Sequence, residues 1–252
     1  MPAAADDKRL SLSSIRAKYN DPTAFGPVDE WHQYTANEIS RLISECWKKL
    51  DIRGKVLNAG SGSRDLGIGT ERVINLDLAE WRVAHLREPV VANVEALPLA
   101  SETLSAVICV GSVINYCDAA SAIAEFGRVL RAGGYLLIEF ESSYSGEYLR
   151  NKHFGMPVGV FETFYCGRNE VVWGYRVEYI QNLLKEANVI PIDILPIHIL
   201  SPWILLWTSN LRISTVFGHG DPAARRIPGL ARWASNFLMI CRKHTHPPLR
   251  QS

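Results

Sequence analysis

The feature that most constrains the fold is a repeated alternation between short apolar runs and stretches with helical periodicity. Apolar residues recur at helical spacing from Ile39 to Leu50, ahead of the first apolar run, and from Ala122 to Leu130, ahead of the fourth. The apolar runs predict strands at 55–59, 72–76, 104–110 and 135–140. Strands that alternate with helices in this way are typical of a parallel sheet with helices on both faces, so the sequence predicts an α/β fold.

The second half of the chain has weaker patterns. Residues 141–175 are rich in Gly, Tyr and Phe without a clear period, which predicts a loop or lid. A helix is predicted at Tyr179–Ala187, with Asn188 as its left-handed cap, and further strands at Val189–Leu195 and Asn236–Lys243. Residues 209–232 are basic and irregular, and their pattern predicts no definite structure.

Composition limits the kinds of partner and compartment. The 252 residues include 27 basic and 26 acidic side chains, a formal net charge of +1, which argues against a nucleic acid as the main partner. The five cysteines are odd in number and form no Cys-x-x-Cys pair, and the N-terminus has no secretory pattern. His244 and His246 lack a third ligand for a metal ion. We therefore expect a cytoplasmic protein with reduced thiols and no metal.

One apolar stretch raises the question of a membrane span. Residues 189–207 are the most apolar of the chain, but Asp193, His198 and three prolines interrupt them. Because proline breaks helical hydrogen bonding, a buried strand and loop is predicted there instead of a span. A chain of this length buries a sizeable core, so we expect a single domain over 1–252.

A glycine-rich turn follows the first predicted strand. Gly60 and Gly62 lack side chains, so a ligand can approach the backbone and accept hydrogen bonds from its N–H groups. Asp77 ends the next strand, where a carboxylate can bind two ribose hydroxyls. Taken singly, the glycines need only make a turn, and Asp77 need only cap a helix starting at Leu78. Together they predict a nucleoside site.

The residues after the glycines bear on which nucleoside is bound. A dinucleotide fingerprint would continue to a third glycine, but Asp65 stands there. Its charge would repel a pyrophosphate, although the neighbouring Arg64 can offset the repulsion. A dinucleotide-dependent (NAD-type) oxidoreductase therefore remains an alternative.

Four segments in order carry a specific resemblance: VLNAGSGS (56–63), INLDL (74–78), ANVEALPL (92–99) with LSAVICVGSVINY (104–116), and EFGRVLRAGGYLLIEF (125–140). In these segments the chain resembles a class I S-adenosylmethionine-dependent methyltransferase of the small-molecule type. The resemblance covers roughly residues 50–141 and implies a Rossmann-like, doubly wound sheet of seven strands, mostly parallel, with an antiparallel last strand. It divides the chain into a helical cap (1–50), a cofactor-binding core (51–141), a lid and acceptor-side insertion (142–235), and the last strand and tail (236–252).

The resemblance also implies how S-adenosylmethionine is bound. The first turn would lie under its methionine part, Asp77 would hold the ribose, the next loop would border the adenine, and the end of the fourth strand would lie beneath the sulfonium. An asparagine at 93 stands in place of the family's aspartate, and its oxygen still accepts a hydrogen bond. The implied cofactor residues are Asn58, Ala59, Gly60, Ser61, Gly62, Asp77, Leu78, Asn93, Val94, Glu95, Val110, Gly111, Ser112 and Tyr116.

Three positions depart from the family pattern. Asn58 replaces an acidic residue of the first strand, which removes a charge that attracts the cationic cofactor, and Asp65 is a hypothetical replacement. Only 14 residues separate Gly62 from Asp77, so 64–71 is expected to be a loop or one short turn. Ser105 stands where an aspartate is common. None of these changes removes a group that methyl transfer needs.

The acceptor is expected to be a small, partly apolar metabolite, because aromatic side chains are frequent in 141–175. A base is needed only for a protonated nucleophile, and Glu141 and His153 are the candidates, with no catalytic residue assigned. An alternative is a catalytically silent module that binds S-adenosylmethionine without turnover. The sequence does not indicate which atom is methylated.

Overall fold

The computed structural model describes residues 12–21, 23, 28, 30–62, 66, 68, 72–165, 168–208, 211–227 and 229–245. The chain forms two compact units, each built from three stretches of sequence. The sheet unit consists of Ile39–Phe140, Val177–Leu195 and Leu238–Ser252. The second unit consists of Met1–Glu38, Glu141–Arg176 and Pro196–Phe237. The single-domain organisation stays a prediction, and the two units are described separately below.

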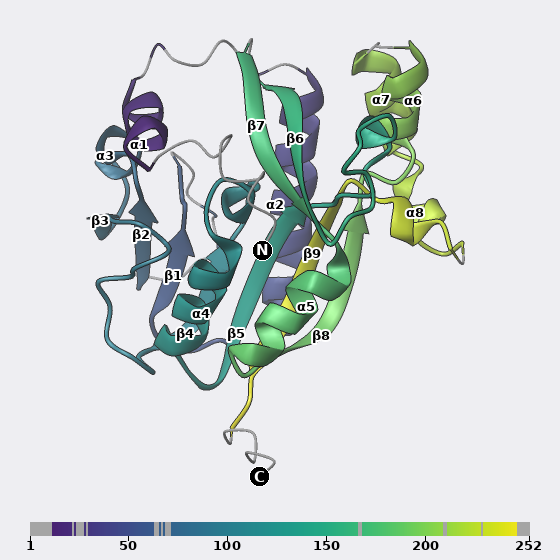
Figure 1. Cartoon of the computed structure of the whole chain (residues 1–252). Coiled ribbons are helices and arrows are strands. Elements are labelled where there is room, and N and C mark those ends of the chain that lie inside the picture. Colours follow the sequence, from purple (N-terminus) through teal and green to yellow (C-terminus); the bar gives the residue numbers. More distant parts are fainter. Residues whose placement is uncertain are drawn as a thin grey trace. The chain divides into compact units, whose positions relative to one another are not determined.

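The principal sheet has seven strands in the order β3-β2-β1-β4-β5-β9-β8. β1 pairs in parallel with β2 and β4, and the parallel pairing continues to β3 on one side and β5 on the other. Figure 1 shows the last strand, β9, running opposite to its neighbours, so the predicted mostly parallel sheet with one antiparallel strand is confirmed. The strands are β1 (Val56–Ala59), β2 (Val73–Asp77), β3 (Pro89–Val91), β4 (Leu104–Cys109), β5 (Leu130–Glu141), β8 (Val189–Ile197) and β9 (Asn236–Lys243).

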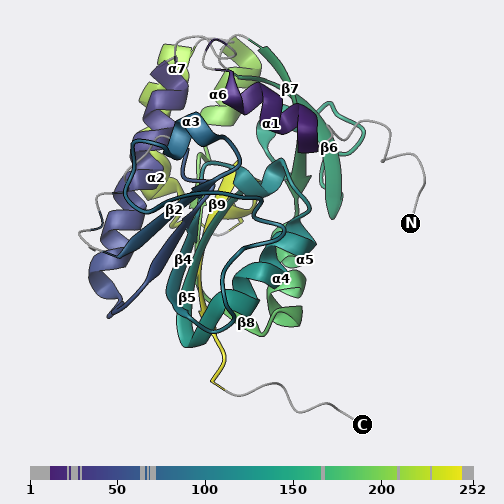
Figure 2. The same ribbon diagram turned by 90° about the vertical axis from the view of Figure 1, so that its left-hand side faces the viewer.

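Helices cover both faces of this sheet. Figure 2 shows α2 (Glu30–Lys49) on one face, and α4 (Ala119–Val129) and α5 (Val177–Glu186) on the other. All residues of β1 and β4 are buried, which explains their continuous apolar sequence. The left-handed cap predicted after α5 is confirmed, since Asn188 has φ = 60°. α3 (Glu80–Val83) is a single turn after β2.

The strand order fixes where a ligand binds in such a sheet. From β1 the chain proceeds outward through β2 to β3, and then returns to place β4 on the other side of β1. The carboxyl ends of β1 and β4 therefore meet where the order of strands reverses, which is the usual ligand position in open α/β sheets. The predicted glycine turn lies at this point.

The second unit corrects the prediction of a loop over 141–175. β6 (Val158–Tyr165) and β7 (Arg168–Tyr175) form a two-stranded antiparallel sheet, in which Gly159 lies opposite Gly174. A Cβ atom on either glycine would lie 2.6–2.7 Å from the ring of Phe161. These glycines therefore make room for an aromatic ring inside a hairpin, although in the sequence they resemble loop residues.

Helices complete the second unit. The predicted strand at 189–195 is confirmed as β8, but the loop predicted after it is wrong in part, because Ser201–Thr208 forms helix α6. Residues 209–232, for which the sequence predicts no definite structure, contain two helices, α7 (Leu211–Gly218) and α8 (Asp221–Ala224). Within the described part of the chain, no helix is long and apolar enough to cross a membrane. The elements are α1 (Leu12–Asn20), η3 (Gly146–Tyr148), α6 (Ser201–Thr208), α7 (Leu211–Gly218), α8 (Asp221–Ala224) and η4 (Ala231–Trp233); η2 (Val113–Asn115) belongs to the sheet unit.

Candidate functional site

The turn after β1 requires glycine at two positions. Gly60 has φ = 68° and Gly62 has φ = 55°, in the left-handed region that side chains disfavour. A Cβ atom at position 60 would also lie 2.4 Å from Cγ2 of Val113. The N–H of Ser61 donates to the carbonyl of Leu76 (2.9 Å), which ties the turn to β2. The backbone of this turn is therefore held close to the carboxyl edge of the sheet.

Asp77 holds this turn directly. Its Oδ2 accepts a hydrogen bond from the N–H of Gly62 (2.8 Å), and its Oδ1 accepts one from the N–H of Ala79 (2.9 Å). The residue is buried, and α3 begins only at Glu80 without a side-chain cap. The helix-capping alternative is therefore wrong. Each carboxylate oxygen has a further lone pair, so Asp77 can still accept hydrogen bonds from ribose hydroxyls.

Asn58 takes part in a buried amide chain within the sheet. Its Nδ2 donates to Oδ1 of Asn75 (2.9 Å), and Nδ2 of Asn75 donates to the carbonyl of Arg87 (2.7 Å). Position 58 thus joins β1 to β2 and carries no charge. Ser105, the other departure on a strand, donates its hydroxyl to the carbonyl of Arg53 (2.6 Å). The proposed substitute acid, Asp65, lies outside the described residues.

A buried carboxylate that the sequence analysis missed holds the end of β4. Oε2 of Glu139 accepts hydrogen bonds from the N–H groups of Gly111 (2.8 Å) and Ser112 (2.7 Å). Both residues have positive φ, 84° and 58°, and Glu139 is completely buried. A buried carboxylate costs free energy unless it is paired, so an acid inside the apolar strand YLLIEF was the signal to look for. It supplies a negative charge below the β4 loop.

The loop at 93–97 is shaped by short polar contacts. Oδ1 of Asn93 accepts a hydrogen bond from the N–H of Glu95 (3.1 Å), which closes an Asx turn. Oε1 of Glu95 accepts one from the N–H of Asp118 (2.7 Å), just before α4. Val94 is buried between them. The loop is therefore attached to α4, and the second lone pair of the Asn93 oxygen remains able to accept a ligand hydrogen.

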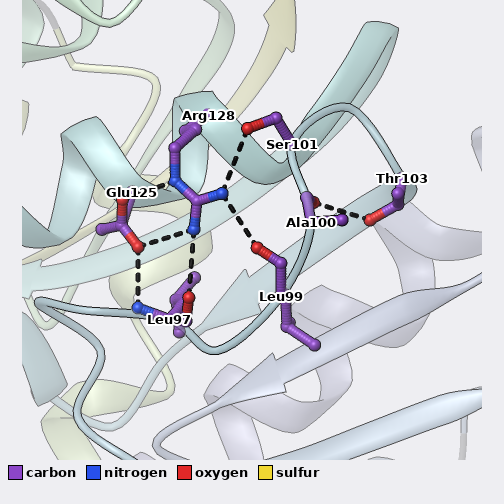
Figure 3. A network of polar contacts seen from close by, with 7 residues as sticks. All are labelled: Leu97, Leu99, Ala100, Ser101, Thr103, Glu125 and Arg128. Atoms are coloured by element: carbon purple, nitrogen blue, oxygen red, sulfur yellow. Dashed lines mark hydrogen bonds and ion pairs between the residues drawn. The ribbon is translucent and has the colours of Figure 1, made fainter.

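Figure 3 shows that two segments of the resemblance form one network. Arg128 donates to the carbonyls of Leu97 (3.1 Å) and Leu99 (2.8 Å), and its ion partner Glu125 accepts from the N–H of Leu97 (2.7 Å). The hydrogen bond from Arg128 holds the pKa of Glu125 below its ordinary value. The ion pair on α4 therefore fixes the backbone of the loop that follows β3.

The thiol of Cys109, at the end of β4, is not suited to nucleophilic chemistry. Burial, with the neighbouring charges of Cys117 and Glu139, raises the pKa of the Cys109 thiol well above its ordinary value. A protonated thiol is a poor nucleophile. Among the described residues no group of His, Cys, Asp and Glu side chains is arranged to hold a metal ion, and His246 lies outside them.

The two candidate bases belong to the second unit. Oε2 of Glu141 accepts a hydrogen bond from the hydroxyl of Tyr148 (2.9 Å), whose ring stacks on Phe161 at 4.1 Å. Nδ1 of His153 lies 2.9 Å from the carbonyl of Val160. A carbonyl only accepts, so Nδ1 carries the proton and the lone pair of the neutral ring is on Nε2.

The structure thus brings most of the expected residues to one edge of the sheet unit. The turn at 59–62 is bonded to Asp77, and the loop at 110–112 is bonded to Glu139. Leu78, Val110 and Tyr116 are half-buried near the ends of β2 and β4. Their contacts with a cofactor stay predictions.

Comparison with known proteins gives matches of three kinds. A family model described as a methyltransferase domain matches residues 57–138. The ubiquinone/menaquinone biosynthesis C-methyltransferase UbiE of Syntrophotalea carbinolica is 31% identical over 155 residues, which are 52% of this chain and 60% of the relative. The match thus spans less than two thirds of that relative.

Solved structures share the fold. The [4+2]-cyclase SpnF has a TM-score of 0.62 at 16% identity, covering 94% of this chain and 98% of its own. Geranyl diphosphate C-methyltransferase from Streptomyces coelicolor A3(2) has a TM-score of 0.54 at 14% identity, covering 92% and 97%. At these identities the likeness concerns the fold alone.

Proposed function

We propose that this chain is a class I S-adenosylmethionine-dependent methyltransferase, as the matched methyltransferase domain at 57–138 suggests, and that it transfers a methyl group from S-adenosylmethionine to a small, partly apolar acceptor. The observation that carries the proposal is the bond between Gly62 and Asp77 inside the matched domain. This hydrogen bond holds the glycine turn next to the Asp77 carboxylate. The N–H groups of the turn can bind one part of a ligand and the carboxylate can bind ribose hydroxyls, a combination that suits an adenosyl group.

In the proposed binding mode each loop contacts one part of the cofactor. Ala59, Gly60, Ser61 and Gly62 border the methionine part, next to Asn58, and Asp77 accepts hydrogen bonds from both ribose hydroxyls. Leu78, Asn93, Val94 and Glu95 border the adenine. Val110, Gly111, Ser112 and Tyr116 lie beside the sulfur. The hydrogen-bond networks of Glu139 and Arg128 support this mode, because they hold the last two loops in place.

We further propose that Glu139 supplies the negative charge that Asn58 lacks. The cofactor carries a positive sulfonium, and a fixed carboxylate beneath the loop at 111–112 would stabilise it electrostatically. The carboxylate is fully buried, so solvent screens it less than it would screen a surface acid. Glu139 would act through the loop and is a positioning and electrostatic residue.

Bound S-adenosylmethionine supplies an activated methyl group. The protein then needs to align the acceptor with the sulfur–methyl bond and to exclude water from the site. If the acceptor is a hydroxyl or a carbon acid, a base must take its proton, and we propose Glu141 for this step. Tyr148 would orient the Glu141 carboxylate through their hydrogen bond.

The apolar character of the acceptor rests on two observations. The second unit contains half-buried aromatic rings in mutual contact, with Tyr144 5.4 Å from Phe154 and 5.7 Å from Trp233 between ring centroids. The named methyltransferase relatives act in quinone biosynthesis or on geranyl diphosphate. A partly apolar acceptor suits such rings.

Titration calorimetry with S-adenosylmethionine, with its product S-adenosylhomocysteine and with NAD tests the proposal. We expect both adenosyl ligands to bind and Asp77→Asn to weaken both by about 10- to 100-fold, the value of a charged hydrogen bond. Asp51→Asn is the matched control, because Asp51 is an exposed aspartate paired with Arg53. Binding of NAD alone would favour the oxidoreductase alternative.

Methyl transfer itself needs a second measurement. Incubation with methyl-labelled cofactor and a metabolite extract should move label into a small molecule. Cofactor binding without transfer to any compound would favour the silent binding module.

A further inference from the structure

Helix α7 has its apolar side facing outward. Ile213, Val216 and Phe217 are 41%, 68% and 47% exposed, while the small residues Ser214 and Gly218 are buried. A helix at the surface of a globular protein ordinarily places its apolar residues toward the core. The arrangement in α7 is the reverse.

Close packing fixes this orientation. A Cβ atom at Gly218 would lie 2.7 Å from the ring of Tyr34, so the helix approaches its neighbour on the glycine side. Ser214 is fully buried on the same inner side. If α7 were rotated to bury Val216 and Phe217, these larger side chains would have to fit into the space that Ser214 and Gly218 occupy. The outward apolar face is therefore a consequence of the sequence of α7.

Helix α6 adds the most exposed aromatic residue described in the second unit. Trp207, near its C-terminal end, is 83% exposed. α6 and α7 pack side by side (Figures 1 and 2). We call the exposed residues Trp207, Ile213, Val216 and Phe217 the α6–α7 surface. Exposed apolar side chains on neighbouring helices often mark a binding site.

The segment that carries this surface is basic in sequence. Residues 201–235 contain four arginines and one acidic residue, Asp221, which gives a net charge of 4 − 1 = +3. Asp221 is buried, whereas Arg212, Arg226 and Arg232 are exposed. Arg212 lies on the outward side of α7, one position before Ile213 and one turn before Val216, and pairs with the exposed Glu30. Arg212, with its partner Glu30, therefore borders the apolar face, within a segment of net positive charge.

We propose that the α6–α7 surface docks on the surface of an anionic phospholipid bilayer. Tryptophan prefers the headgroup region, and arginine side chains beside apolar residues reach phosphate groups while their stems stay in apolar surroundings. Helices of eight residues are about 12 Å long, too short to cross a bilayer, so they would lie in its surface. Docking would give the proposed enzyme access to an apolar acceptor dissolved in the membrane.

Charge complementarity favours a bilayer over a second copy of the chain. A two-fold dimer through this surface would bring two copies of the same net-basic segment together. Anionic headgroups instead carry the opposite charge. The net charge of the segment therefore suits an anionic layer better than a second copy.

Sedimentation with vesicles tests the proposal. We expect the full chain to bind vesicles of equal parts phosphatidylglycerol and phosphatidylcholine at least 10-fold more strongly than vesicles of phosphatidylcholine alone, and to lose most binding in 0.5 M salt. Trp207→Ser with Phe217→Ser should lower binding to the anionic vesicles at least 10-fold. Ile192→Ser is the matched control, since Ile192 is 51% exposed on β8, and should bind like wild type.

Two results would overturn the proposal. One is equal or absent binding to the two kinds of vesicle. The other is a dimer, seen by light scattering after gel filtration, that the Trp207 and Phe217 substitutions convert to a monomer. Cofactor affinity, measured on every variant, should not change, because these residues lie outside the proposed cofactor site. Loss of vesicle binding with normal cofactor binding thus separates this proposal from the proposed function.

Discussion

Replacing Glu139 by glutamine should reduce the preference of the protein for S-adenosylmethionine over S-adenosylhomocysteine. The substitution removes the negative charge but keeps an oxygen that can accept from the N–H groups of Gly111 and Ser112, now at 2.8 and 2.7 Å from Oε2. For an assumed separation of about 7 Å between this carboxylate and a sulfonium bound above the loop, and an effective dielectric constant of about 20, Coulomb's law gives about 2 kcal/mol.

This energy applies only to the charged ligand. S-adenosylmethionine has a sulfonium, whereas the sulfur of S-adenosylhomocysteine is neutral. The Kd of S-adenosylmethionine should therefore rise about 30-fold in Glu139→Gln, while the Kd of S-adenosylhomocysteine changes by less than about threefold. Calorimetric titration of wild type and variant with both ligands measures the two changes, and thermal unfolding checks that the variant is folded.

The ratio of the changes in Kd for the two ligands distinguishes an electrostatic role of Glu139 from a structural one. If Glu139→Gln weakens both ligands equally, the carboxylate acts only by shaping the loop, and the electrostatic role is wrong. Asp65→Asn is the parallel experiment for the alternative acid. If Asp65→Asn alone lowers the preference for the charged ligand, the missing charge of Asn58 is supplied from position 65 instead.

Three further predictions concern the sheet unit and the buried histidine. Gly60→Ala should unfold the protein or remove cofactor binding, because the new Cβ atom would be at a residue with positive φ and would clash with Val113. Gly62→Ala has the same kind of φ but only an Arg82 nitrogen 3.8 Å from the new Cβ atom, so it should lower the free energy of unfolding in urea by about 1–2 kcal/mol. Glu125→Gln should destabilise the protein at pH 7 by about 1–2 kcal/mol. Because Arg128 lowers the pKa of Glu125, the wild type should lose this advantage over the variant as pH falls below 4.5, and a difference in stability that stays the same well below that pH would contradict the prediction. Burial lowers the pKa of His198 from 6.5 to about 4. The free energy of unfolding should therefore be about 2 kcal/mol lower at pH 5 than above pH 6.5, because the unfolded chain binds a proton that the folded chain does not. Urea unfolding of His198→Phe should not show this loss.

The cofactor half of the fold could be predicted because its sequence signals are local. Buried strands are continuous apolar runs, and β9 begins and ends at the predicted residues, Asn236 and Lys243. Gly60 and Gly62 are required by backbone angles that few other residues adopt. The bond of Asp77 to the turn follows once the two strands are neighbours. Such features need no knowledge of distant packing.

The parts that escaped prediction depend on contacts between distant residues. Gly159 and Gly174 resemble loop residues until the hairpin places both against Phe161. Glu139 stands out in the sequence as an acid in an apolar strand, but its role is defined only when the loop after β4 folds onto its carboxylate. The outward face of α7 depends on Tyr34, which lies far away in the sequence. In each case tertiary contacts decide the role of the residue.

The charge beneath the β4 loop also separates methyl transfer from other chemistry on the same fold. The likeness to a structure named a cyclase shows that this fold alone does not determine the reaction. An enzyme that turns over must release S-adenosylhomocysteine and rebind S-adenosylmethionine, so a charge that favours the sulfonium about 30-fold keeps product from occupying the site. A clear preference for the charged ligand, lost in Glu139→Gln, would therefore support the electrostatic role of Glu139, whereas transfer of labelled methyl to an acceptor distinguishes an enzyme from the silent module.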